Sequence, residues 1–104
     1  MEFEELKNRA LKIRAKYAEL EKKKYGREWT REEVFQGLVG DVGGLSKQVM
    51  VESDIRTSKD DHGIDHHLAD CLWSLIVLAE KYNIDLEKSF VKTMNELEKK
   101  IASE

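Results

Sequence analysis

The sequence predicts an all-α protein built from four helices. The 104 residues contain no proline and only 6 glycines, so residues that interrupt a helix are scarce. Apolar residues recur every three or four positions in four separate segments, which is the spacing of an amphipathic helix. Helix start and stop signals lie between these segments. The length suits a single domain spanning residues 1–104.

Residues 2–24 form the first predicted helix, and Gly26 is a stop signal just after it. The second begins after Thr30, because Thr30 and Glu33 have the spacing of a capping box, and it continues to about residue 51. Both carry apolar residues at helical spacing. In the first these are Phe3, Leu6, Ala10, Ile13, Tyr17 and Leu20, and in the second Val34, Leu38, Val42, Leu45 and Val49.

Residues 52–64 are polar, charged and aperiodic, which predicts a loop. The third helix runs from about residue 65 to residue 82. A short turn follows, in which Asn83 or Asp85 caps the fourth helix. The fourth helix carries Leu86, Phe90, Met94, Leu97 and Ile101. Two short connections and one longer loop favour a four-helix bundle.

Burial and assembly follow from the same periodicity. Four helices of this length have more apolar surface than one thin bundle can enclose, so we expect a dimer or a higher oligomer. Trp73 is expected to pack in the core. The residues expected to be largely buried are Leu38, Val42, Leu45, Leu68, Leu72, Leu75, Ile76, Phe90 and Met94.

Composition narrows the class of partner. Charged residues make up 38% of the chain, mixed in sign, and the net charge is −3, so a DNA or RNA partner is not expected. No apolar run approaches the length of a membrane span, and the acidic N-terminus is unlike a signal peptide. The one cysteine, Cys71, lies in the most apolar segment and reads as a small buried hydrophobe. These features predict a cytoplasmic protein.

Asp70 is a candidate functional residue, because it lies among the apolar residues of the third helix. A buried carboxylate needs a metal ion, a cation or a hydrogen-bond network. His67 and His66, three and four positions earlier, can flank it on one face of the helix.

Gly37, Gly40 and Gly44 share one stripe of the second helix, where each glycine is unfavourable by about 0.5–1 kcal/mol relative to alanine. Two interpretations are open. The glycines allow a close approach of another helix, or they mark a face that once lined a ligand or metal site.

Two blocks of sequence resemble the MazG-like, all-α nucleoside triphosphate pyrophosphohydrolases. The first is Gly37–Lys47 (GLVGDVGGLSK), and the second is His67–Ala79 (HLADCLWSLIVLA), continuing through Ile84–Glu87. The resemblance extends over roughly residues 29–101. It implies a bundle that assembles as a homodimer or homotetramer. It also implies a reaction in which two pairs of carboxylates hold Mg²⁺ while water cleaves a nucleoside triphosphate to the monophosphate and pyrophosphate.

This chain departs from that pattern at the metal ligands. The first carboxylate pair falls on Asp41 and Gly44, and the second falls on His67 and Asp70. Asp41 and Asp70 are therefore the candidate catalytic and metal-binding carboxylates. Binding of Mg²⁺ is expected to be weak, and hydrolysis weak or lost.

Three alternatives remain open at this stage. The chain is a catalytically silent nucleotide-binding protein, or a structural oligomer, or it has adapted its site to Zn²⁺, Ni²⁺ or Co²⁺. The last alternative uses His66, His67 and Asp70 with Asp41, because imidazole suits these metals better than Mg²⁺. Otherwise the two histidines only cap or solvate the start of their helix.

The resemblance also suggests where a nucleotide binds. Trp29, just before the second helix, is a candidate for stacking on a base, or it packs on Val34 as a hydrophobic staple. Lys47, Arg56 and Lys59 are candidates for contacts with phosphates. The identity of the base and sugar stays open.

Overall fold

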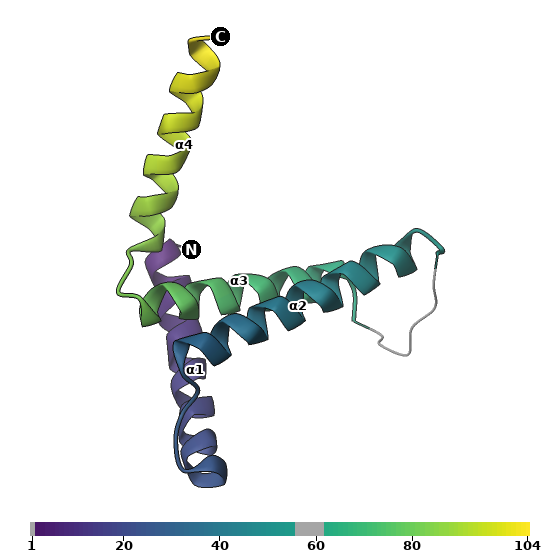
Figure 1. Ribbon diagram of the computed structural model, residues 1–104, viewed down its shortest axis with the longest axis vertical. Coiled ribbons are helices and arrows are strands. Elements are labelled where there is room, and N and C mark those ends of the chain that lie inside the picture. The colour runs from purple at the N-terminus through teal and green to yellow at the C-terminus, as the bar shows by residue number, and fades with distance from the viewer. Residues whose placement is uncertain (1, 56–61) are drawn as a thin grey trace.

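The computed structural model describes residues 2–55 and 62–104. Within these residues the chain forms four helices and no strand (Figure 1). They are α1 (Phe3–Tyr25), α2 (Arg31–Glu52), α3 (Ile64–Lys81) and α4 (Leu86–Ala102). The all-α class and the four predicted helices are confirmed, with ends close to the predicted ones. None of the described helices is long and apolar enough to cross a membrane.

Local signals set the end of α1 and the start of α2. Gly26 adopts a left-handed conformation with φ of 81°, and its N–H donates to the carbonyl of Lys22 at 2.9 Å. Thr30 and Glu33 form the predicted capping box, in which the Glu33 N–H donates to Thr30 Oγ1 at 3.2 Å. A hydrogen bond from Arg27 lowers the pKa of Glu33 to about 2, so this carboxylate is ionised at neutral pH.

The turn between α3 and α4 also follows the prediction. Asn83 has a positive φ of 56°, and the side chain of Asp85 accepts a hydrogen bond from the N–H of Lys88 at 3.0 Å. Asp85 is therefore the cap of α4.

The helices do not close into a compact bundle within one chain. Helices α2 and α3 pack side by side, α1 crosses α3, and α4 projects away from the other three (Figure 1). The radius of gyration is 16.7 Å, against about 13 Å for a compact domain of this length. The single chain therefore has an open shape.

The open shape leaves much of the predicted core exposed. Among the described residues, the buried apolar side chains are Ala18, Val34, Ile76 and Val77. Ile76 is buried as predicted, and Leu38, Leu45 and Met94 are partly covered. Within the single chain, the predicted burial is not found for five residues, because α1 covers only one side of the α2–α3 pair and α4 covers neither. These five are 44% to 61% exposed: Val42, Leu68, Leu72, Leu75 and Phe90.

Candidate functional site

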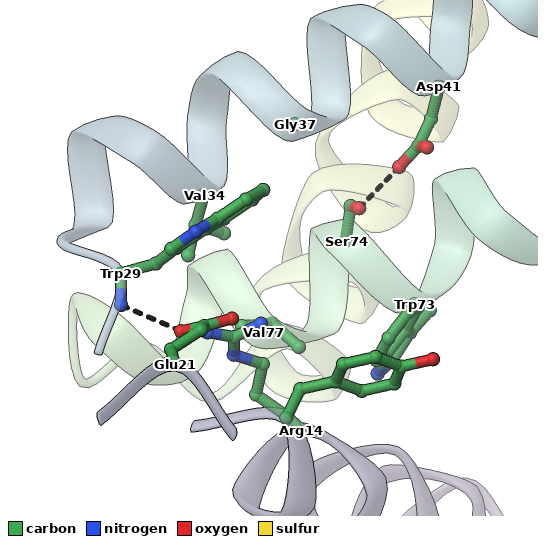
Figure 2. Close-up of a pocket in the computed structure, with 10 residues that line it drawn as sticks. Arg14, Glu21, Trp29, Val34, Gly37, Asp41, Trp73, Ser74 and Val77 are labelled. Carbon is green, nitrogen blue, oxygen red and sulfur yellow. Dashed lines mark hydrogen bonds and ion pairs between the residues drawn. The ribbon is translucent and has the colours of Figure 1, made fainter. Parts of the chain in front are cut away.

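A pocket of about 330 Å³ lies where α1, α2 and α3 meet (Figure 2). We call it the aromatic pocket, since two tryptophans and a tyrosine contribute to its wall. Its lining residues are Arg14, Tyr17 and Glu21 of α1, Trp29, Val34, Gly37 and Asp41 in and before α2, and Trp73, Ser74 and Val77 of α3.

Packing holds the aromatic side chains in place. The Trp73 ring lies 5.7 Å from the Tyr17 ring between centroids, and the Trp73 indole N–H donates to the carbonyl of Ala10 at 3.0 Å. The Trp29 indole lies over Gly37, where an added Cβ would come within 3.0 Å of its six-membered ring. Gly37 thus gives the Trp29 ring the space it occupies.

The segment that carries Trp29 is anchored from two helices. Its backbone N–H donates to Oε1 of Glu21 at 2.8 Å, and its carbonyl accepts from the Lys81 ammonium group at 3.2 Å. Trp29 and Val34 line the same pocket; Trp29 directly precedes the Thr30 cap and Val34 is the fourth residue after it, as in a hydrophobic staple. Packing of Trp29 on Val34 and stacking of Trp29 on a base are therefore compatible interpretations.

A charged pair closes the α1 side of the pocket. The Arg14 guanidinium forms an ion pair with the carboxylate of Glu21, and its carbon atom Cζ lies 5.5 Å from the centroid of the Trp29 ring. Glu21 is buried, so its pairing offsets the loss of hydration. The buried Nε of Arg14 has no hydrogen-bond partner among the described residues. A buried donor of this kind normally binds water or a ligand acceptor.

Asp41 connects the pocket to the predicted metal site. Its carboxylate Oδ2 accepts a hydrogen bond from the Ser74 hydroxyl at 2.5 Å, across the α2–α3 interface (Figure 2). Asp41 is partly buried, and this bond supplies a protein partner for one carboxylate oxygen.

The other predicted metal positions form two separate contacts in the structure, Gly44 with His67 and His66 with Asp70. An added Cβ on Gly44 would lie 3.2 Å from Nδ1 of His67, so the imidazole occupies the space beside Gly44. Asp70 Oδ2 lies 3.2 Å from Nε2 of His66, in an i, i+4 pair on α3. Positions 41 and 44 thus face α3, as the resemblance implies.

These residues do not fit Mg²⁺, which prefers several hard oxygen ligands. Gly44 has no side-chain oxygen, and the His67 ring packs where a carboxylate would be needed. Within residues 2–55 and 62–104, no group of three or more histidine, cysteine, aspartate or glutamate side chains is placed to hold a metal ion. The preference for Zn²⁺, Ni²⁺ or Co²⁺ at His66, His67 and Asp70 stays a prediction.

Cys71, which follows Asp70 in α3, is not activated. Its partial burial raises the pKa of the thiol, and the negative charges of Asp41 and Asp70 raise it further. A thiol held protonated in this way is a poor nucleophile.

Trp29 lines the aromatic pocket, but none of the residues predicted to contact phosphates is found there within the described part of the chain. Lys47 is exposed on α2 and does not line the aromatic pocket. Arg56 and Lys59 lie outside the described residues. Arg14 is the cation that lines the pocket, and it is paired with Glu21.

Sequence reasoning missed Arg14, Glu21 and Ser74. A signal for the first two exists, because residues seven apart return to the same side of a helix, and Ala18 lies between them on that side. Arg14, Ala18 and Glu21 face the other helices, whereas Leu20 on the predicted apolar stripe is exposed. For Ser74, no sequence pattern distinguishes it from other helical serines.

Neither a protein-family model, nor a curated protein, nor a solved structure matches the chain. The relationship to MazG-like proteins therefore stays a hypothesis that rests on the sequence motifs.

Two glycines of α2 provide a test of how the pocket is held open. Gly37→Ala is expected to displace the Trp29 ring and to weaken binding of a stacking ligand. Gly40→Ala is the matched control, because an added Cβ at Gly40 meets nothing within 4 Å. It should stabilise the protein by about 0.5–1 kcal/mol. Thermal unfolding and tryptophan fluorescence measure both effects. If the two variants behave alike, Gly37 does not make room for the Trp29 ring.

Proposed function

We propose that this chain is an oligomeric nucleotide-binding protein of MazG-like lineage whose pyrophosphohydrolase activity is weak or lost. The ligand binds in the aromatic pocket. The proposal rests on the contrast between two neighbouring sites. The aromatic pocket is lined by side chains that packing holds in place, whereas at the predicted metal site His67 fills the space beside Gly44.

The pocket has the features of a site for a planar ligand. Its volume of about 330 Å³ lies near the lower end of the range for small-molecule sites, roughly 300–1,000 Å³. Stacking of a base on an aromatic side chain contributes about 1–3 kcal/mol. Trp29 and Trp73 offer such surfaces, and the polar groups of Arg14, Glu21 and Asp41 can orient a ligand between them.

The same contrast argues against efficient hydrolysis. Release of pyrophosphate in the MazG-like reaction requires Mg²⁺ at two carboxylate pairs, and only Asp41 and Asp70 remain here as carboxylates. Each of them has a hydrogen-bonding or ionic partner within the chain, Ser74 for Asp41 and His66 for Asp70. Efficient metal-dependent hydrolysis is therefore not expected of this chain.

Oligomerisation is supported by the surface area. One chain exposes 8271 Å², against about 6,000 Å² for a compact monomer of 12.1 kDa. The excess is of the order of the area that stable interfaces bury. Exposed apolar residues at helical spacing on α3 (Leu68, Leu72 and Leu75) and on α4 (Phe90, Leu97 and Ile101) are the candidates for this interface. A homodimer or homotetramer would cover them.

Tryptophan fluorescence tests the proposal directly, because the chain has 2 tryptophans and both line the pocket. Titration with nucleosides and nucleotides should change the emission and raise the unfolding temperature. Trp29→Ala should weaken binding by about tenfold to a hundredfold, which corresponds to the loss of one stacking contact. Tyr25→Ala is the matched control, since Tyr25 is 64% exposed and lies outside the pocket. No response to any nucleoside or nucleotide would refute the proposal.

A further inference from the structure

We infer that the aromatic pocket selects an uncharged or cationic planar heterocycle, such as a free base or nucleoside, over a nucleoside polyphosphate. The inference rests on the proposed function, since it names the class of ligand that the proposed site takes. It departs from the triphosphate that the resemblance implies, and the reason lies in the charges that line the pocket.

The pocket has an excess of negative charge. Among the residues that the structure describes, two carboxylates, Glu21 and Asp41, line it together with one guanidinium, that of Arg14. Arg14 already forms an ion pair with Glu21, so its charge is balanced within the protein. Within residues 2–55 and 62–104, no cation is paired with Asp41, and its hydrogen-bond partner is the neutral hydroxyl of Ser74. A polyanion that entered this pocket would be repelled rather than attracted.

A metal ion could reverse this preference, but the chain lacks the ligands to hold one. Mg²⁺ shields a polyphosphate only where oxygen ligands fix the ion beside it. The position next to Asp41 on α2 is Gly44, and the space beside it is filled by His67. The described residues therefore provide neither a free cation in the pocket nor a metal site next to it.

The remaining polar atoms match the edge of a heterocycle. The carboxylate of Asp41 can accept a hydrogen bond from a ring N–H or an exocyclic amine through the oxygen that Ser74 does not use. The buried Nε of Arg14, which has no protein partner among the described residues, can donate to a ring nitrogen or carbonyl. Trp29 and Trp73 offer the stacking surfaces. The pocket thus holds a donor, an acceptor and aromatic walls.

The test compares each nucleoside with its own 5′-triphosphate. Adenosine, cytidine, guanosine, uridine and their triphosphates are titrated into the 104-residue chain, in EDTA and separately in Mg²⁺, with tryptophan fluorescence as the readout. At least one nucleoside should bind about tenfold or more tightly than its triphosphate in both buffers.

Asp41→Asn isolates the contribution of charge, because the amide keeps the shape of the side chain and can still accept from Ser74. In this variant the nucleoside should bind more tightly than its triphosphate by a ratio several-fold smaller than in the parent, because the negative charge that repels the triphosphate is gone. Glu80→Gln is the control, since this exposed carboxylate of α3 does not line the pocket. It should leave the ratio unchanged.

The outcomes separate the two proposals. A triphosphate that binds more tightly than its nucleoside in EDTA overturns this inference and leaves the proposed nucleotide-binding function standing. A ratio that Asp41→Asn does not change also overturns it. If no nucleoside or nucleotide alters the fluorescence or the unfolding temperature, both proposals fail.

Discussion

The Gly44→Glu/His67→Glu double substitution is expected to create a Mg²⁺ site and to give measurable release of pyrophosphate from nucleoside triphosphates. Positions 44 and 67 contact each other across the α2–α3 interface, and each is one helical turn from a retained carboxylate, Asp41 or Asp70. Two carboxylate pairs would then face each other, which is the arrangement that the MazG-like pattern implies. Mg²⁺ at about a hundred times its dissociation constant should stabilise the variant by about 2.7 kcal/mol.

The two changes are expected to depend on each other. Gly44→Glu alone brings a Cβ to 3.2 Å from Nδ1 of His67, so the ring must move by a few tenths of an ångström, and this strain should offset the stability gained by replacing a helical glycine. His67→Glu removes the ring and relieves this contact. Calorimetry with Mg²⁺ and thermal unfolding of the two single variants and the double variant measure the coupling.

Gly43→Glu/His67→Glu is the matched control for the new site. It has the same composition and charge, but an added Cβ at Gly43 meets nothing within 4 Å, so the carboxylate is one position away from the interface. It should neither bind Mg²⁺ nor hydrolyse nucleotides. If the first double variant folds like the parent yet behaves like this control, the assignment of positions 44 and 67 is wrong.

Leu75→Glu is expected to dissociate the assembly. Leu75 is 44% exposed in the single chain, so a glutamate there costs little in an isolated monomer. In an oligomer that covers α3, the change would lose the burial of a leucine, about 1.5–3 kcal/mol per copy, and would place a charge in an apolar interface. The dissociation constant should rise by about a hundredfold or more. Light scattering across a concentration series measures it.

Asn95→Glu serves as the control for that experiment. Asn95 is exposed on α4 and lies on the side opposite Phe90 and Leu97, so the new charge should leave the assembly intact. A parent protein that is monomeric at micromolar concentration would contradict the proposed assembly.

The helices could be predicted from the sequence because their signals are local. The capping box of Thr30 and Glu33, the left-handed Gly26 and the Asp85 cap each depend on residues within one turn. Burial could not be predicted in the same way. The periodicity shows that Leu72 and Leu75 share a side of α3, but not which element covers that side.

The candidate site was predictable only in part. Asp41, Gly44, His67 and Asp70 were placed on facing helices by the resemblance, and the contact of Gly44 with His67 agrees with that placement. The pocket itself depends on the crossing of α1 over α3, which no local pattern encodes. The ion pair of Arg14 with Glu21 could not be predicted either. Charged residues on a helix are usually solvated, and only the packing of α1 against the other helices buries this pair.

Release of pyrophosphate by the parent protein tests most directly whether the metal-dependent reaction has been lost. A panel of nucleoside triphosphates is incubated with the parent and with Asp70→Asn, each with Mg²⁺ and with EDTA, and pyrophosphate is measured. We predict that the parent releases little or no more pyrophosphate in Mg²⁺ than Asp70→Asn does. Efficient Mg²⁺-dependent release by the parent, with many turnovers per protein molecule, that Asp70→Asn abolishes would contradict the account.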